Sequence, residues 1–215
     1  MSATPSETTT ERSFFVHPQA LVESTEIGRN TRVWAFAHVM RGARVGADCN
    51  IGDHAFIETG AILGNNVTVK NGVAIWDRVT IEDNVFLGPN CVLTNDLNPR
   101  AYIKKSGSTL VPTLIRENAT IGANVTIVCG VTIGQYAFIG AGAVVIRSVP
   151  DFALIVGNPG RQIGWMCVCA EKLPIPAGAP RDSSVTCPHC RRSFVVAPEG
   201  LSVVEEVLIG KGENQ

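Results

Sequence analysis

The chain has 215 residues, of which 45% are hydrophobic, 17% charged and 6% aromatic, and its formal net charge at pH 7 is −1. This balance excludes an intrinsically disordered chain, and it provides no positive surface that would indicate a DNA or RNA partner. No apolar run reaches the 18 or so residues of a membrane-spanning helix, so we expect no membrane partner either.

Residues 1–14 are polar and lack the apolar core of a secretory signal, so we expect a disordered lead. The seven cysteines are an odd number, which does not suit a secreted disulfide framework. Reduced thiols and a cytoplasmic location fit this sequence better.

From Val33 the chain repeats every six residues. Eleven aliphatic residues follow in phase as far as Leu93, and six more run from Ile115 to Val145. The position two before each aliphatic is small or β-branched, and glycine often follows the aliphatic. A period of six fits neither an α-helix nor a simple alternating strand. It fits a triangular coil of three short strands, with the aliphatic inside, the small residue at a tight corner and glycine at strained backbone positions.

Three hexads make an 18-residue coil, so the 17 hexads predict almost six stacked coils, and residues 16–27 add an imperfect first one. We therefore expect an all-β fold, a parallel β-helix over residues 15–166, with an ordinary β-sandwich as the alternative. Residues 95–114 interrupt the phase, which predicts a functional loop protruding from one corner. Its Arg100, Lys104 and Lys105 suit a phosphate-bearing ligand, although a solvated loop is the alternative.

The composition changes in residues 167–215, which we expect to form a small cysteine-rich tail resembling a zinc ribbon. Two close pairs, Cys167 with Cys169 and Cys187 with Cys190, predict a tetrahedral structural Zn²⁺ site. His189 is an alternative ligand, and four free thiols on a β-hairpin are the alternative to a metal site. Residues 187–196 and 201–208 are expected to form short strands, and so small a unit would benefit from a metal.

Several segments resemble a known family: WAFAHV, DCNIGDHAFIE, KNGVAIWD, TNDLNPR and VPDFALIVGNPG. The chain resembles hexapeptide-repeat acyltransferases that N-acetylate nucleotide-linked amino sugars. Residues 33–100 are similar to the dTDP-3-amino-3,6-dideoxyhexose enzymes, and residues 119–166 to the UDP-2-acetamido-3-amino-2,3-dideoxyglucuronate enzymes. The resemblance implies a left-handed β-helix, a homotrimer, and acetyl transfer from acetyl-CoA to the sugar C-3 amine.

This reaction needs a neutral amine held close to a thioester carbonyl, and stabilisation of the oxyanion that forms. The resemblance places the side chain of Asn95 at the reacting amine, which its carbonyl oxygen would orient, with the CoA sulfur taking the proton. His54 is the best candidate for a general base, because the pKa of imidazole lies near the operating pH. His38, almost one coil earlier in the chain, would lie near the same face. The alternatives are a turn role for Asn95 and surface roles for both histidines.

The remaining candidates bind the two substrates. Lys70 and Arg100 would pair with the diphosphate, and Trp76 would stack on a pyrimidine or pack between subunits. The sugar-nucleotide residues are expected to be His38, Glu58, Lys70, Asn71, Trp76, Asp77, Asp96 and Arg100. By resemblance, acetyl-CoA runs between two subunits along Gly122, Ala123, Gly140, Ala141, Ala143, Arg147, Asn158 and Arg161.

Other functions of this architecture remain open. An O-acetyltransferase acting on a small acceptor is the enzymatic alternative, and a non-catalytic hexapeptide scaffold is the alternative of another class. A γ-type carbonic anhydrase would need three zinc-binding histidines, and the sequence has no two histidines with four residues between them.

Overall fold

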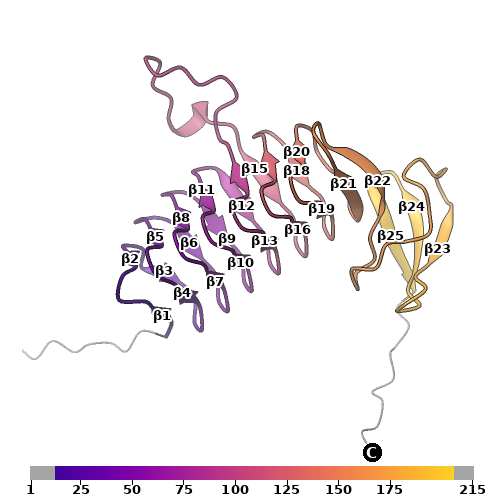
Figure 1. The fold of residues 1–215 in the computed structure, drawn as a ribbon, viewed down its shortest axis with the longest axis horizontal. Coiled ribbons are helices and arrows are strands. Elements are labelled where there is room, and N and C mark those ends of the chain that lie inside the picture. Colours follow the sequence, from indigo (N-terminus) through magenta and orange to yellow (C-terminus); the bar gives the residue numbers. More distant parts are fainter. Residues whose placement is uncertain (1–12, 206–215) are drawn as a thin grey trace, which may run out of the picture.

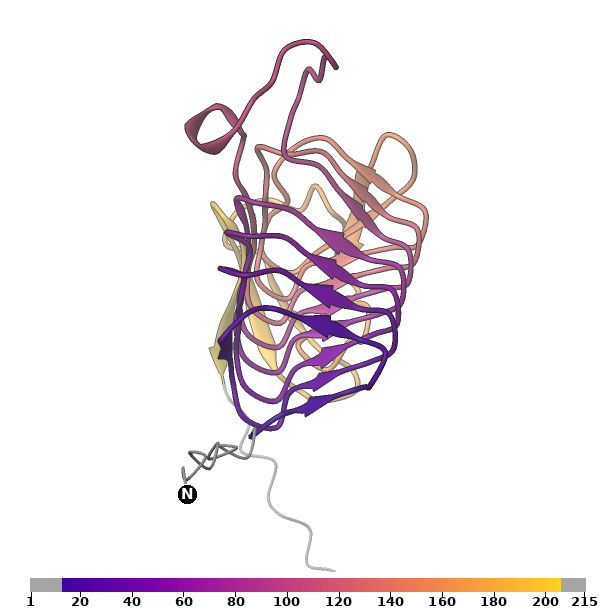
Figure 2. The ribbon, with the colours of Figure 1, turned by 90° about the vertical axis from the view of Figure 1, so that its left-hand side faces the viewer.

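The computed structural model describes residues 13–205, so most of the expected lead over residues 1–14 lies outside the described residues. The described chain forms a triangular prism of stacked coils, and a small antiparallel sheet follows at its C-terminal end (Figure 1). Figure 2 looks along the prism and shows three flat faces and the loop that leaves one edge. The expected all-β fold, a left-handed parallel β-helix, is confirmed.

Each complete coil adds one short strand to each of three parallel sheets, which we call faces A, B and C. Face A contains β1 (Phe15–Val16), β4 (Arg32–Val33), β7 (Asn50–Ile51), β10 (Thr68–Val69), β13 (Phe86–Leu87), β16 (Thr120–Ile121), β19 (Phe138–Ile139), β21 (Ala153–Val156) and the antiparallel β22 (Arg161–Trp165). Face B contains β2 (Leu21–Val22), β5 (His38–Val39), β8 (Phe56–Ile57), β11 (Ala74–Ile75), β14 (Val92–Leu93), β17 (Thr126–Ile127) and β20 (Val144–Val145). Face C contains β3 (Glu26–Ile27), β6 (Arg44–Val45), β9 (Ile62–Leu63), β12 (Val79–Ile81), β15 (Thr113–Ile115) and β18 (Thr132–Ile133).

The register explains the period of six. Val33 pairs with Ile51 and Ile51 with Val69, so side chains one full coil apart in the chain stack directly on one another. The in-phase aliphatic side chains fill the prism and are at most 4% exposed. The small residues two positions earlier are buried beside them. The first coil, β1 to β3, pairs in register with the second, which confirms the imperfect coil expected over residues 16–27.

The corners follow the same period. The residue three positions before the aliphatic has a left-handed backbone, with φ between 54° and 87°, at every hexad from Asn30 to Asn90 and from Asn118 to Gly142. Most of these residues are Asn, Gly or Asp, which adopt this conformation at the least cost.

The glycines that follow the aliphatics have a different role from the one expected. Gly52, Gly88 and Gly122 have no positive φ, so strain is not the reason for their presence. An added Cβ at Gly122 would lie 2.6 Å from the backbone nitrogen of Ala141 in the next coil. These glycines are required because neighbouring coils approach one another closely there.

The loop leaves the prism between β14 and β15, and its one regular element is the 3₁₀ turn η1 (Gly107–Thr109). Leu87 pairs directly with Ile121 although the loop lies between them in the chain. The loop therefore lengthens one coil without disturbing the stack. Both views show it projecting away from the prism (Figures 1 and 2).

The tail forms an antiparallel sheet of β23 (Ser184–Thr186), β24 (Ser193–Ala197) and β25 (Gly200–Glu205). The strand expected over 187–196 begins only at Ser193, because residues 187–192 form a turn. The strand expected over 201–208 agrees with β25 as far as residue 205, and its last residues lie outside the described ones. One hydrophobic core continues from the prism into this sheet. Within residues 13–205, no helix is long and apolar enough to span a bilayer.

Candidate functional site

The predicted site residues lie mainly on two edges of the prism. Edge AB is the row of corners that lead from face A to face B, and edge BC is the row that leads from face B to face C. Edge BC carries Glu58, Trp76, Asp77, Asn95 and Arg147, and the loop that bears Asp96 and Arg100 leaves from it. Edge AB carries His54, Lys70, Asn71, Gly122, Ala123, Gly140 and Ala141.

On edge BC the residues around Asn95 are connected from coil to coil. The Asn95 side-chain amide donates a hydrogen bond to the Asp77 carbonyl oxygen at 3.4 Å. The backbone N–H of Asp77 in turn donates to a carboxylate oxygen of Glu58 at 2.8 Å. The Asn95 bond uses the nitrogen of the amide, so the amide oxygen remains an acceptor. A half-buried amide oxygen in this position is suited to accept a hydrogen bond from an amine.

The loop has its own ion pair. The Lys105 ammonium group bonds Asp96 Oδ1 at 2.6 Å and the carbonyl oxygen of Asn98 at 3.0 Å. The hydrogen bond from Lys105 lowers the pKa of the Asp96 carboxyl, with help from the backbone N–H of Asn98. Lys105 is therefore engaged within the loop, whereas Arg100 and Lys104 are exposed and lie outside this ion pair.

Two residues that the sequence analysis missed contact the predicted ones: Glu23, on edge BC just after β2, and Phe56, on face B. His38 Nε2 lies 3.0 Å from a carboxylate oxygen of Glu23, and this hydrogen bond lowers the pKa of the Glu23 carboxyl. Phe56 packs between His38 and Trp76, with ring centroids 5.5 Å and 5.6 Å away. The signal that could have found Phe56 is its separation of one full coil from His38, which puts the two on the same face of successive coils.

His54 lies on edge AB, at a left-handed corner with φ of 58°. Its ring stacks on Phe36, at the equivalent corner of the preceding coil, with centroids 4.9 Å apart and planes 15° from parallel. The expectation that His38 and His54 share one face is therefore wrong. The two histidines are slightly less than one full coil apart in the chain, so His38 projects from a strand of face B while His54 occupies the corner before the next strand of that face.

Asn95 and His54 are likewise not brought together within one chain. They lie at opposite ends of the face B strands, and at 3.3 Å per residue the width of that face is roughly 15 Å. Lys70 and Asn71 are exposed on the His54 side, away from Trp76 and Asp77. In the described chain the candidate residues thus lie in two separate groups, one on each edge, which we call half-sites.

The small residues expected to line the acetyl-CoA groove, from Gly122 to Ala141, continue edge AB toward the C-terminus. Arg147 lies on edge BC instead, so the expected groove residues do not form one row within one chain. The Gly142 N–H donates to the Ala123 carbonyl oxygen, which links the corners that contain Gly122 and Gly140. The expectation that Ala143 lines this groove is wrong, because its side chain is fully buried inside the prism.

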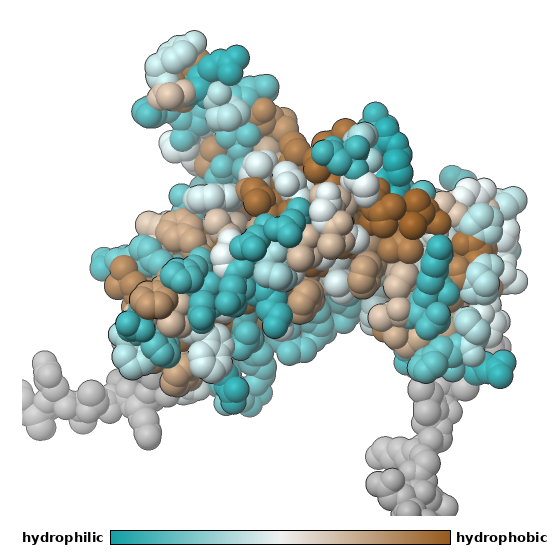
Figure 3. Space-filling model, viewed as in Figure 1, coloured by the Kyte–Doolittle hydropathy of each residue, from teal (hydrophilic) through white to brown (hydrophobic). Residues whose placement is uncertain are grey.

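Two arginines share a cavity at the C-terminal end. Arg147 and Arg161 line a space of about 490 Å³ together with apolar residues such as Ile146. Figure 3 shows apolar atoms gathered near β22, where Ile163 is 47% exposed. Asn158 precedes a cis proline in the turn between β21 and β22. Positive charge beside apolar surface suits a ligand that has both phosphates and an alkyl chain.

The four cysteines of the tail come together as the sequence predicts. The sulfur atoms of Cys167, Cys169, Cys187 and Cys190 all lie within 4.8 Å of one another, and two of the separations are 3.3 Å and 3.7 Å. Burial raises the pKa of the Cys167 thiol. Burial also acts on Cys190, but the backbone N–H of Arg192 and the other thiols outweigh it and lower its pKa to about 7. His189 is exposed and is not part of this group.

The chain matches the family model described as bacterial transferase hexapeptide (six repeats) over residues 24–59, 60–95 and 112–147. It is 52% identical over 165 residues to the dTDP-3-amino-3,6-dideoxy-α-D-galactopyranose 3-N-acetyltransferase of Aneurinibacillus thermoaerophilus, covering 74% of this chain and 82% of that one. A putative acetyltransferase of Schizosaccharomyces pombe is 43% identical over 84 residues, which are 37% of this chain and 40% of that one.

Among the solved structures that the chain matches is the acetyltransferase domain of PglB from Neisseria gonorrhoeae in complex with acetyl coenzyme A. It is 22% identical, with a TM-score of 0.48 over 70% of this chain and 58% of that chain. GDP-perosamine N-acetyltransferase from Caulobacter crescentus is 21% identical, with a TM-score of 0.43 over 71% of this chain and 54% of that one.

Proposed function

Since the chain belongs to the bacterial hexapeptide transferase family, we propose that it is an acetyl-CoA-dependent N-acetyltransferase for the C-3 amine of a nucleotide-linked amino sugar. The observation that carries this proposal is the 52% identity to a dTDP-amino-sugar 3-N-acetyltransferase across most of both chains. The Asn95 side chain supports it, because its nitrogen bonds the Asp77 carbonyl oxygen and its oxygen remains an acceptor that would orient an amine.

In the proposed reaction the amine nitrogen attacks the thioester carbonyl carbon. A C–N bond forms, the C–S bond breaks, and the amine proton leaves with the CoA sulfur or on a base. Asn95 holds the amine through its Oδ1, since an amide has no useful basicity and acts by orientation. A backbone N–H of a coil would stabilise the oxyanion. His54 is the candidate base of the other half-site.

A homotrimer accounts for the two half-sites. Because Asn95 and His54 lie on opposite sides of face B, one active site can contain both only if edge BC of one copy faces edge AB of another. Acetyl-CoA would then lie along the small residues around Gly122 and Gly140, with its phosphates near Arg147 and Arg161.

We also propose that the tail binds one structural Zn²⁺ through Cys167, Cys169, Cys187 and Cys190. A tetrahedral site with Zn–S bonds of about 2.3 Å has sulfur atoms about 3.8 Å apart, close to the separations found here. Backbone hydrogen bonds close both cysteine turns, since the N–H of Cys167 donates to the Glu171 carbonyl oxygen and the N–H of Cys187 to the Arg192 carbonyl oxygen. Such a site needs reduced thiols, which supports a reducing, cytoplasmic location.

The function is tested by release of the CoA thiol from acetyl-CoA in the presence of a dTDP-3-amino-3,6-dideoxyhexose or a UDP-3-amino-glucuronate. Thiol release with one of them supports the proposal and identifies the nucleotide. Release only with a hydroxyl acceptor would favour an O-acetyltransferase, and a chain that binds no CoA would be a scaffold.

A further inference from the structure

Strand β22 connects two features of the C-terminal region. Its first residue, Arg161, lines the cavity that also contains Arg147. Its last residue, Trp165, lies two positions before Cys167, the first of the four tail cysteines. Among the described residues β22 pairs only with β21, because it is the last strand of the face A sheet, and the register of this pairing skips Ile163. Strand pairing alone therefore gives β22 limited support.

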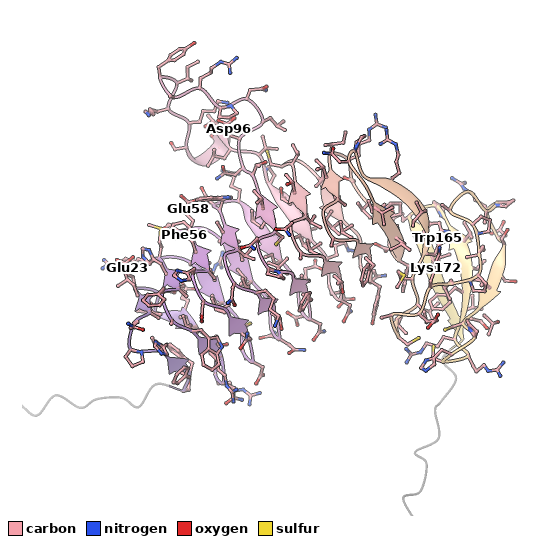
Figure 4. The ribbon with its side chains drawn as sticks, viewed as in Figure 1. Glu23, Phe56, Glu58, Asp96, Trp165 and Lys172 are labelled. Carbon is pink, nitrogen blue, oxygen red and sulfur yellow. The ribbon has the colours of Figure 1, made fainter. Side chains whose placement is uncertain are left out.

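Further support comes from the tail, and it is concentrated at Trp165. The Trp165 side chain is 4% exposed, and its indole N–H donates to the Pro176 carbonyl oxygen at 3.1 Å. The Leu173 N–H donates to the Trp165 carbonyl oxygen at 2.9 Å, and an isolated bridge joins Met166 to Lys172. Figure 4 shows Trp165 and Lys172 together where the last coils meet the tail. Trp165 is therefore the residue through which the tail holds the end of β22.

The partners of Trp165 depend in turn on the cysteine group. They lie in residues 172–176, directly after the first cysteine turn. That turn meets the second one through two close sulfur pairs, Cys167 with Cys190 and Cys169 with Cys187. Contacts between thiols are weak hydrogen bonds, whereas a Zn²⁺ ion would bind all four sulfur atoms as thiolates and contribute folding free energy. The stability of residues 167–176 should thus depend on zinc.

Resting on the proposed function and on its zinc site, we infer that Trp165 is a positioning residue that makes acetyl-CoA binding depend on zinc in the tail. Zinc would fix residues 167–176, and these would fix Trp165 through the contacts described above. Strand β22 would then hold Arg161 in place toward the phosphates of the cofactor. The two ends of this strand are about 13 Å apart at 3.3 Å per residue, so the zinc site would act without touching the cofactor.

The effect should be moderate, because the cavity holds a second positive charge that does not depend on β22. Arg147 follows β20, in the last corner of edge BC. A looser β22 would weaken the contact of Arg161 with a phosphate and leave Arg147 in place. Hydrogen bonds between arginine and phosphate require a defined geometry. The arrangement therefore predicts a several-fold change in acetyl-CoA affinity and not the loss of binding.

The test uses the full-length, zinc-loaded chain and the variant Trp165→Phe, which keeps a ring in the core and removes the indole N–H to Pro176. The KM for acetyl-CoA should rise about fivefold, since one charged contact is weakened. The KM for the amino-sugar acceptor, kcat and the zinc content should change little. The KM for S-acetylpantetheine, which has no phosphates, should also stay the same. Trp34→Phe is the matched control, because it removes an indole N–H bond to Asn50 at the other end of the prism.

Hydrogen exchange provides a readout that needs no turnover. Removal of zinc by a chelator should speed the exchange of backbone N–H groups in β22 more than in the middle coils, and calorimetric titration should show weaker CoA binding. Trp165→Phe should speed exchange in β22 while zinc stays bound. If chelation unfolds the whole chain, the kinetics and exchange of Trp165→Phe decide the question.

Equal rises in KM for acetyl-CoA and S-acetylpantetheine with Trp165→Phe would show a general loss of structure and overturn the inference. Unchanged kinetics, or unchanged exchange in β22, would overturn it as well. A chain that transfers acetyl groups but contains no zinc, or that binds CoA equally with and without zinc, would refute the inference and leave the proposed acetyltransferase in place. A chain that binds no CoA in either form would refute both.

Discussion

The rings of Phe152 and Phe194 meet edge to face with centroids 5.5 Å apart, and both side chains are at most 2% exposed. Phe152 belongs to the last coil and Phe194 to β24, so this contact joins the prism to the tail. Asp151 lies beside it, where its N–H donates to the Glu199 carbonyl oxygen and its carboxylate bonds the Arg116 guanidinium at 3.0 Å. The tail therefore covers the open C-terminal end of the sheet stack, where unpaired strands would otherwise invite association.

Replacing Phe194 with alanine should lower the free energy of unfolding by about 3 to 5 kcal/mol, the usual cost of removing a buried aromatic ring. Denaturant unfolding of the variant measures this. Val203→Ala, a truncation at a side chain that is 40% exposed, should change stability by less than about 1 kcal/mol. Equal effects of the two substitutions would contradict the role of the contact.

Asn95→Ala should lower kcat for the amino-sugar acceptor by roughly 100-fold, because positioned polar groups contribute on this scale. The oligomeric state should not change, because the hydrogen bond from Asn95 to Asp77 is long, at 3.4 Å, and its loss should cost the fold little stability. Steady-state kinetics and sedimentation velocity provide the two measurements. Asn98→Ala in the exposed part of the loop is the control, and unchanged kinetics for Asn95→Ala would remove Asn95 from the mechanism.

Metal analysis of protein purified without chelator should find about one zinc per chain. Cys190→Ser should abolish it, whereas Cys129→Ala, a buried cysteine outside the group, should retain it. Zinc should also be lost as the pH falls below about 5, because protons compete for the thiolate ligands. A chain that contains no zinc, or zinc that survives Cys190→Ser, would refute the site.

The Asp96–Lys105 pair gives a prediction on pH. The pKa of Asp96 is lowered in the folded chain, so the pair stabilises the loop above the ordinary carboxyl pKa and is lost as the pH falls through the folded value. Asp96→Asn and Lys105→Met should both make the loop more susceptible to limited proteolysis at neutral pH. Lys104→Met should not, because Lys104 lies exposed next to the pair without belonging to it. Equal cleavage of all three variants would contradict the prediction.

Gly122→Ala should destabilise the prism by about 1 to 3 kcal/mol, because the new methyl group would overlap the backbone of Ala141. Thermal unfolding measures the effect. Gly178→Ala is the matched control, since nothing lies within 4 Å of a Cβ added there. A neutral Gly122→Ala would show that neighbouring coils can separate at this corner.

Much of this molecule could be read from the order of its residues. The interior aliphatics and the first coil follow from local spacing, because each coil repeats the same backbone path and stacks equivalent positions on one another. The protruding loop follows from the break in this spacing, and the cysteine group from two close cysteine pairs in the tail. The same rule would have found Phe56 above His38 and Phe36 beneath His54. The same rule also explains why the prediction that His38 and His54 share one face is wrong. Their separation is slightly less than one full coil, which places His38 on a strand and His54 at a corner.

The sequence by itself determined the architecture, because burial of one aliphatic in every six residues leaves few other ways to remove that surface from water. Only the tertiary structure decided which functional groups meet. The Glu23–His38 pair depends on where two side chains of different coils end, and the separation of Asn95 from His54 depends on the width of face B. Such lateral relationships arise from three-dimensional packing, which a linear period does not encode.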